Sequence, residues 1–164
     1  MSRKAIIAIV MVAVLVAGVV SYRLWFSDER AIKKQLALVE KEGSKAEGEQ
    51  PMDGLIKAVK IAALFSDPCQ LIVESVRYDG SYSRKDIQEY IMLVRSLFTR
   101  VEVSMHDVVI DRIVNKTTVV RGTLRLHGKA TGEAVADAYK FQAEAAKIDG
   151  EWLFTSVTIV ELLE

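Results

Sequence analysis

Side chains suited to acid–base or metal chemistry are few in this chain, and they are not clustered. The sequence holds two histidines, His106 and His127, and one cysteine, Cys69. On neighbouring strands the two histidines would lie side by side near Asp107 or Asp111, where they could bind a metal or exchange protons. Both histidines fall at polar positions of alternating strands, so we favour exposed surface side chains. We therefore predict no metal site and no cofactor.

Sequence motifs for nucleotide binding and nucleophilic catalysis are also absent. The glycines do not have the spacing of a phosphate-binding loop, and no Gly-x-Ser-x-Gly sequence occurs. Cys69 cannot form an internal disulfide, and its position between Pro68 and the apolar residues 71–73 predicts burial. The sequence thus names no catalytic residue, and a non-enzymatic role is favoured.

The first 26 residues have the composition of a membrane anchor. Ala5–Val20 contains sixteen residues without a polar side chain. At 1.5 Å per residue this run rises about 24 Å, less than the roughly 30 Å of a hydrocarbon core. Extending the helix to Phe26 closes the gap. Arg23 would then reach the headgroups, and Trp25 would lie in the interfacial layer.

Flanking charges predict how this anchor is oriented. Arg3 and Lys4 precede the run without any acidic residue, which favours a cytoplasmic N-terminus. We therefore expect a single-pass inner (cytoplasmic) membrane protein, with a signal-anchor over residues 1–26 and a periplasmic or otherwise extracytoplasmic domain over residues 27–164. A cleaved secretory signal and a buried helix of a soluble protein are the alternatives.

Charge and length limit what this domain could be. The whole chain has 22 basic and 22 acidic residues, and the first 26 residues contain three of the basic ones. The remainder is therefore mildly acidic, which argues against nucleic acid as a partner. Residues 27–164 are long enough for one domain with a core, but not for two.

Helical periodicity dominates the first half of this domain. Ser27 is expected to cap a helix that stops at Gly43, and a polar loop follows up to Pro51. A second helix is predicted from Met52 to about Phe65, ended by Ser66–Pro68. Its apolar stripe, expected to face the core, consists of Leu55, Ile56, Val59, Ala62 and Ala63.

Alternating patterns dominate the second half. A strand is predicted over residues 70–78, with a turn at 79–80, and Ser83 and Asp86 then start a third helix that extends to Phe98. Four strands follow, with a bulge near residues 107–109. Turns are expected at 115–116 and 149–150, and a loop at 128–132.

This order of elements resembles the nuclear transport factor 2-like superfamily. The features that carry the resemblance are segment 55–66, the capped helix 83–98 and the closing hairpin 149–154. The resemblance implies an α+β cone in which three helices pack on a curved antiparallel sheet, here preceded by one N-terminal transmembrane helix. It is strongest toward uncharacterised bacterial members that are anchored in a membrane.

Proteins of this fold bind ligands inside the cone, and some are cyclases, isomerases or dehydratases that use Asp, His or Tyr at its mouth. The positions considered for such an enzyme are Asp79, Tyr82, Tyr90, His106 and Asp111, none of which matches a family motif. A tentative binding pocket contains Tyr90, His106, Tyr139, Phe141 and Trp152.

The leading hypothesis is a non-enzymatic, membrane-tethered binding or assembly module. Its partner would be another protein or a second copy of the chain. The alternatives are a carrier or sensor of a small apolar ligand that uses the cone cavity, and an enzyme of the cyclase, isomerase or dehydratase type.

Overall fold

The computed structural model describes the backbone of residues 3–163 and the side chains of residues 10–24 and 26–160. The side chains of Arg3, Lys4 and Trp25 lie outside these described parts. The elements, in chain order, are α1 (Arg3–Gly43), α2 (Pro51–Ala62), β1 (Phe65–Val73), η1 (Glu74–Val76), β2 (Tyr78–Tyr82), α3 (Arg84–Leu97), β3 (Phe98–Ile110), β4 (Thr117–Ala130), β5 (Glu133–Ile148) and β6 (Glu151–Leu163).

One continuous helix, α1, replaces the two helices that the sequence suggested. The predicted helix start at Ser27 is wrong, because α1 runs unbroken from Arg3 to Gly43. No Gly or Pro occurs between Val19 and Glu42 to interrupt it. The Arg30 guanidinium also lies 4.5 Å from the centre of the Phe26 ring, across the expected boundary.

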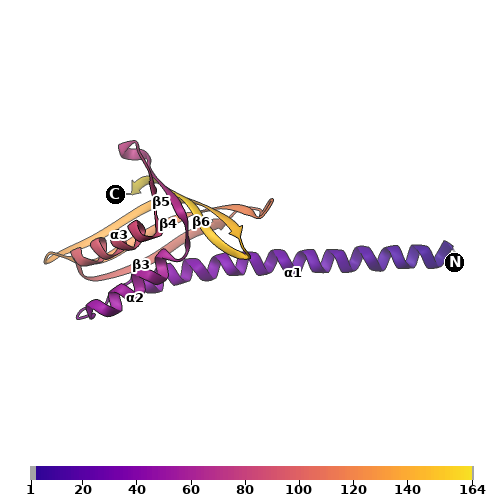
Figure 1. The fold of residues 1–164 in the computed structure, drawn as a ribbon, viewed down its shortest axis with the longest axis horizontal. Helices are drawn as coiled ribbons and strands as arrows, with labels where there is room; N and C mark the ends of the chain where they lie inside the picture. Colours follow the sequence, from indigo (N-terminus) through magenta and orange to yellow (C-terminus); the bar gives the residue numbers. More distant parts are fainter. Residues whose placement is uncertain (1–2, 164) are drawn as a thin grey trace.

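The arrangement of α1 divides it into an exposed and a packed part. In Figure 1, α1 extends far beyond the rest of the molecule at its N-terminal end, while α2 and α3 lie at the opposite end. Side chains described between Val10 and Leu24 are exposed, whereas Ile32 and Leu36 are buried in the core. Over residues 10–43 this helix is long and apolar enough to cross a membrane, a property that signal sequences and some core helices share.

A six-stranded sheet, with the order β2-β1-β6-β5-β4-β3, forms the other layer. The sequence predicted an antiparallel sheet. The sheet is instead mixed, because β1 pairs with β6 in parallel. The β1–β2 hairpin precedes α3 and the long meander in the chain, and it joins the sheet beside the last strand.

Two predicted boundaries around β1 are wrong. The second helix ends at Ala62, and β1 begins at Phe65, so Pro68 lies inside the strand. Proline fits there because the pairing of β1 with β6 is irregular between Phe65 and Gln70. The expected turn at 79–80 belongs to β2, and the chain reverses earlier through η1, where Arg77 has a left-handed backbone conformation.

Several local predictions are confirmed. Ser83 caps α3 in a reciprocal arrangement with Asp86. A bulge interrupts β3 between His106 and Val109. However, the predicted loop at 128–132 is too long, since β4 continues to Ala130 and the turn involves only residues 131–132.

The core lies between α1 and the concave sheet. It is built from the inward-facing positions of the long strands together with one face of α1. Its buried members are Ile32, Leu36, Leu64, Val120, Phe141, Ala143, Ala145, Trp152 and Phe154.

Candidate functional site

A small apolar cavity lies in the centre of the cone. Its volume is about 150 Å³, and all ten lining residues are apolar. Leu36 and Val39 of α1 form one wall, while β3, β4, β5, β6 and Phe65 of β1 form the remainder. The full lining is Leu36, Val39, Phe65, Met105, Leu124, Phe141, Ala143, Phe154, Val157 and Ile159. Among the described residues, no acid or base reaches this space.

A second cavity, of about 180 Å³, lies beneath α3. Phe65 and Val157 line both cavities, so the two spaces are neighbours. The second one is also mainly apolar, but Cys69, Gln70 and tyrosine side chains contribute to its wall. Burial raises the pKa of the Cys69 thiol to about 11, which keeps it protonated and unreactive at neutral pH.

Three tyrosines are grouped at the edge of the second cavity. The hydroxyl groups of Tyr78 and Tyr82 share a hydrogen bond, and the rings of Tyr82 and Tyr90 meet edge to face at 5.5 Å. The hydrogen bond with Tyr78 is the main cause that raises the pKa of Tyr82, and burial adds to it. This hydroxyl therefore stays protonated at neutral pH and is not a base.

The five residues of the predicted pocket are dispersed. Phe141 lines the central cavity and Tyr90 the second one. His106 is exposed and shares a 3.0 Å hydrogen bond with Ser104. The other two residues lie in neither cavity lining: the Tyr139 hydroxyl donates to Asp137, and the Trp152 indole donates to Asp28.

Residues considered for catalysis also remain apart. His127 is opposite Glu102 and His106 is opposite Thr123, so the histidines are separated by four positions along β3. Asp111 pairs with Arg121 at 2.6 Å. Asp79 accepts a 2.8 Å hydrogen bond from Gln70. Within the part of the chain that the structure describes, no group of three or more His, Cys, Asp or Glu side chains forms a metal site.

The most unusual surface consists of two apolar helix stripes that face solvent. On α2 the exposed residues are Met52, Leu55, Ile56 and Val59, and on α3 they are Tyr90, Leu93, Val94 and Leu97. Each set has the i, i+3, i+4, i+7 spacing of one helix face. The predicted burial of Leu55, Ile56, Val59 and Ala63 is therefore wrong, whereas that of Ala62 is confirmed. We call these eight residues the apolar stripes.

Small and polar side chains explain why the stripes face outward. Gly54, Ala58, Ile61 and Ala62 form the buried face of α2, where small side chains allow close packing. The buried residue of α3 is a charged one, Arg95, with a relative exposure of 5%. Each helix thus keeps four large apolar side chains exposed, although Ile61 of α2 is buried and Ile87 and Ile91 of α3 line the second cavity.

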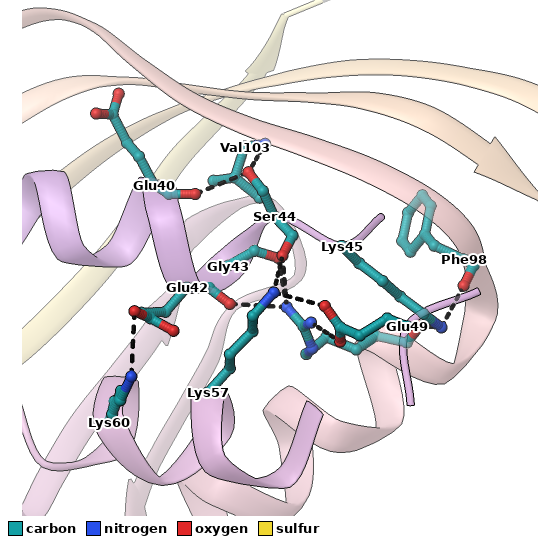
Figure 2. A network of polar contacts seen from close by, with 11 residues as sticks. Glu40, Glu42, Gly43, Ser44, Lys45, Glu49, Lys57, Lys60, Phe98 and Val103 are labelled. Carbon is teal, nitrogen blue, oxygen red and sulfur yellow. Dashed lines mark hydrogen bonds and ion pairs between the residues drawn. The ribbon is translucent and has the colours of Figure 1, made fainter. Parts of the chain in front are cut away.

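A network of polar contacts joins the end of α1 to α2 and α3, and Figure 2 shows Glu42, Glu49 and Lys57 within it. Arg95 of α3, which is buried, makes the largest number of these contacts among the described residues. Its Nη1 donates to the carbonyl oxygens of Glu42 at 2.8 Å, Gly43 at 2.7 Å and Ser44 at 3.3 Å, at the C-terminal end of α1. Its Nη2 pairs with the carboxylate of Glu49. A cation thereby satisfies carbonyl groups that the end of a helix leaves free.

A lysine that follows α1 binds the end of α3 in the same way that Arg95 of α3 binds the end of α1. Lys45, the second residue after α1, donates to the carbonyl oxygens of Arg95 at 3.0 Å and Phe98 at 2.7 Å, at the end of α3. Lys57 of α2 pairs with Glu49 at 2.5 Å. Burial opposes the ionisation of Glu49, but hydrogen bonds and charges from Lys57 and Arg95 outweigh it and lower the pKa of this carboxyl group. The network fixes the position of α1 relative to the two helices that carry the apolar stripes.

Comparisons of sequence identify no relative: no family model matches, and no curated protein matches. Solved structures with the same architecture do match. A hexachlorocyclohexane dehydrochlorinase, LinA-type3, from Novosphingobium barchaimii is similar with a TM-score of 0.64 and 12% identity, covering 84% of this chain and 90% of that one.

Two further similar structures have no stated activity. The Kfla4162 protein from Kribbella flavida has a TM-score of 0.66 at 11% identity and covers 84% of this chain and 94% of its own. A protein of unknown function with a cystatin-like fold from Nostoc punctiforme has a TM-score of 0.61 at 13% identity, with coverages of 81% and 90%. The element order and these similarities show that the chain has the nuclear transport factor 2-like fold.

Proposed function

We propose that this protein is a non-enzymatic binding or assembly module, tethered to the inner membrane by the N-terminal part of α1, that binds a protein partner through its apolar stripes. The observation that carries the proposal is the outward position of both stripes. Large contiguous apolar surfaces on a folded domain are characteristic of interaction sites. The partner is a protein of the extracytoplasmic compartment or a second copy of this chain.

The interior of the cone supports a binding role over a catalytic one. General acid–base catalysis needs a titratable group within hydrogen-bond reach of the substrate. The central cavity presents only hydrocarbon and one thioether, from Met105. The similar dehydrochlorinase shares the fold, whereas the residues described at the central cavity of this chain include no acid or base.

Site-specific photo-crosslinking tests the proposal in the membrane. A photoreactive amino acid would replace Val59 of α2 or Leu93 of α3 in the full chain, expressed in bacterial cells. Val76, which is 70% exposed but lies outside the stripes, is the matched control. We expect a discrete adduct from positions 59 and 93 in alkali-washed membranes and none from position 76. Equal adducts at all three positions, or none at the stripes, would contradict the proposal.

A specific observation favours a second candidate, the binding of a small apolar ligand. Dry cavities of about 150 Å³ lined by aliphatic and aromatic groups bind molecules of the size of benzene. Ala143 lines the central cavity, so Ala143→Leu should fill it. We expect benzene to raise the unfolding temperature of the native chain but not of this variant. An equal shift in both proteins, or none in either, would exclude this role.

A further inference from the structure

Two of the tight hairpin turns carry exposed apolar side chains, and they lie next to each other. These turns are Asn115–Lys116, between β3 and β4, and Asp149–Gly150, between β5 and β6, and all four residues have positive φ angles. The backbone N–H of Lys147 donates to the carbonyl oxygen of Lys116 at 2.9 Å, which holds the turns together. Beside them, Val114 is 55% exposed and Ile148 is 40% exposed.

The hairpin turn between β4 and β5 differs in composition. Its central residues, Thr131 and Gly132, have the same left-handed conformation. Ala130 and Glu133 flank them, and no large apolar side chain is exposed at this turn within the described residues. In Figure 1 it lies at the far end of the sheet. Among the three turns that connect β3, β4, β5 and β6, exposed large apolar side chains therefore occur at the two turns of one end, while at the other end the β1–β2 connection carries the exposed Val76.

The end that carries Val114 and Ile148 is also the end nearest the apolar part of α1. Asp28 of α1 accepts hydrogen bonds from Lys147 Nζ at 2.8 Å and from the Trp152 indole at 3.0 Å, on the two sides of the Asp149–Gly150 turn. Asp28 is eight residues beyond Val20, about 12 Å along the helix axis. If the hydrocarbon core ends near Phe26, Asp28 lies within the headgroup layer, which is roughly 5–8 Å thick.

Two features prevent the domain from swinging away from this level. The helix is unbroken between the apolar run and the core, where the Ile32 side chain is fully buried. Arg95 then holds the C-terminal carbonyl groups of α1 against α3. No flexible linker separates the anchor from the sheet, so the depth of α1 in a bilayer sets the height of both turns.

We propose that the turns at 115–116 and 149–150 rest in the headgroup layer of the membrane that α1 crosses, with Val114 and Ile148 in contact with lipid. The inference rests on the proposed tethering by α1. The contact of the turns with lipid would give the domain a second attachment to the membrane. It would also direct α2 and α3, which carry the apolar stripes, away from the membrane.

The charges near these turns define the kind of lipid surface. Exposed Arg112 and Lys116 are balanced by exposed Asp149 and Glu151. Because these charges balance, the turns have no net attraction for anionic lipid, and the apolar side chains account for the contact. Zwitterionic phosphatidylcholine is therefore a sufficient lipid for this contact. High salt, which screens exposed charges, should leave it unchanged.

Environment-sensitive fluorescence of the full chain in phosphatidylcholine vesicles tests this inference. Single cysteines at Val114, Ile148 or Thr131 would carry the probe, in a Cys69→Ala background, and circular dichroism would verify the fold of each variant. We expect a blue-shifted emission and quenching by brominated lipid for probes at 114 and 148, in low and high salt. The probe at 131 should have the emission of a probe in water and should not be quenched by brominated lipid. Identical emission from all three positions would overturn the inference.

Flotation of the same vesicles separates this inference from the proposal on which it rests. Chains that float after an alkaline wash, but whose probes at 114 and 148 stay in water, would retain the tether and refute the lipid contact. Chains that do not float would refute both the tether and the contact.

Discussion

Arg95 connects three helices through its side chain. It lies at the junction of α1, α2 and α3, and a buried guanidinium of this kind is stable only when its partners remain in place. Its Nη1 donates to the carbonyl groups that end α1, while Nη2 pairs with Glu49. Removing the side chain would leave both the carbonyl groups and a buried carboxylate with fewer partners.

We expect Arg95→Met to lower the free energy of unfolding by about 3–5 kcal/mol, the usual cost of breaking one side of a buried ion pair. Chemical unfolding of the full chain in detergent, followed by circular dichroism, measures this loss. Arg100→Met is the control, because Arg100 is exposed and close by in sequence. Equal effects of the two substitutions would show that the network is not structural.

The pH dependence of unfolding should report on Glu49. Its folded pKa lies below the ordinary value of 4.5, so its ionised form stabilises the fold above that pH. As pH falls through the folded pKa, this stabilisation is lost. Glu49→Gln should be less stable at neutral pH and should lose less stability between pH about 5 and about 3. An acid transition as steep as that of the native chain would argue against this assignment.

Sequence patterns could not identify this network. Arg95 and Glu49 are separated by 46 positions, and each is an ordinary charged residue within a helix or a loop. By contrast, the capping pair Ser83 and Asp86 was predictable, because both partners lie within one turn of chain. Local contacts leave a pattern in the sequence, whereas long-range polar contacts do not.

For helices and strands too, local features were predictable from the sequence and long-range packing was not. The turns at 115–116 and 149–150 and the bulge in β3 follow from residue type and alternation. The outward rotation of α2 does not, because periodicity identifies an apolar face without showing what covers it. Small residues such as Gly54 and Ala58 on the other face were the available signal, since they permit the closest helix packing.

Gly128 gives a prediction for β4. A Cβ atom there would lie 2.1 Å from the backbone oxygen of Arg100 and 2.8 Å from the Cα of Val101. Because neither backbone atom can move without disturbing β3, Gly128→Ala should lower the free energy of unfolding by about 1–3 kcal/mol, as overpacked sites do. Gly18→Ala, which meets nothing within 4 Å, is the matched control in the same unfolding assay. A neutral Gly128 variant would show that β3 and β4 can separate there.

At the scale of the whole molecule, α1 belongs to two environments. Its N-terminal part presents apolar side chains outward, and its C-terminal part is a wall of the core. The sequence indicated both functions but divided them between two helices at Ser27. The structure joins them, so the apolar N-terminal segment and the packed domain share one continuous helix.

This division predicts that substituting two apolar residues of the same helix will change the free energy of unfolding by different amounts. Ile32, fully buried, and Leu24, 61% exposed, are both apolar and lie eight positions apart. Ile32→Ala should lower the free energy of unfolding in detergent by about 2–5 kcal/mol through lost burial and the cavity left behind. Leu24→Ala should change it by less than about 0.5 kcal/mol.

Leu24→Arg should weaken the flotation of the chain with vesicles, because it places a charge near the hydrocarbon boundary. The free energy of unfolding in detergent should stay unchanged in this variant. If Leu24→Ala destabilised the fold as much as Ile32→Ala, the N-terminal part of α1 would belong to the packed domain rather than to a membrane.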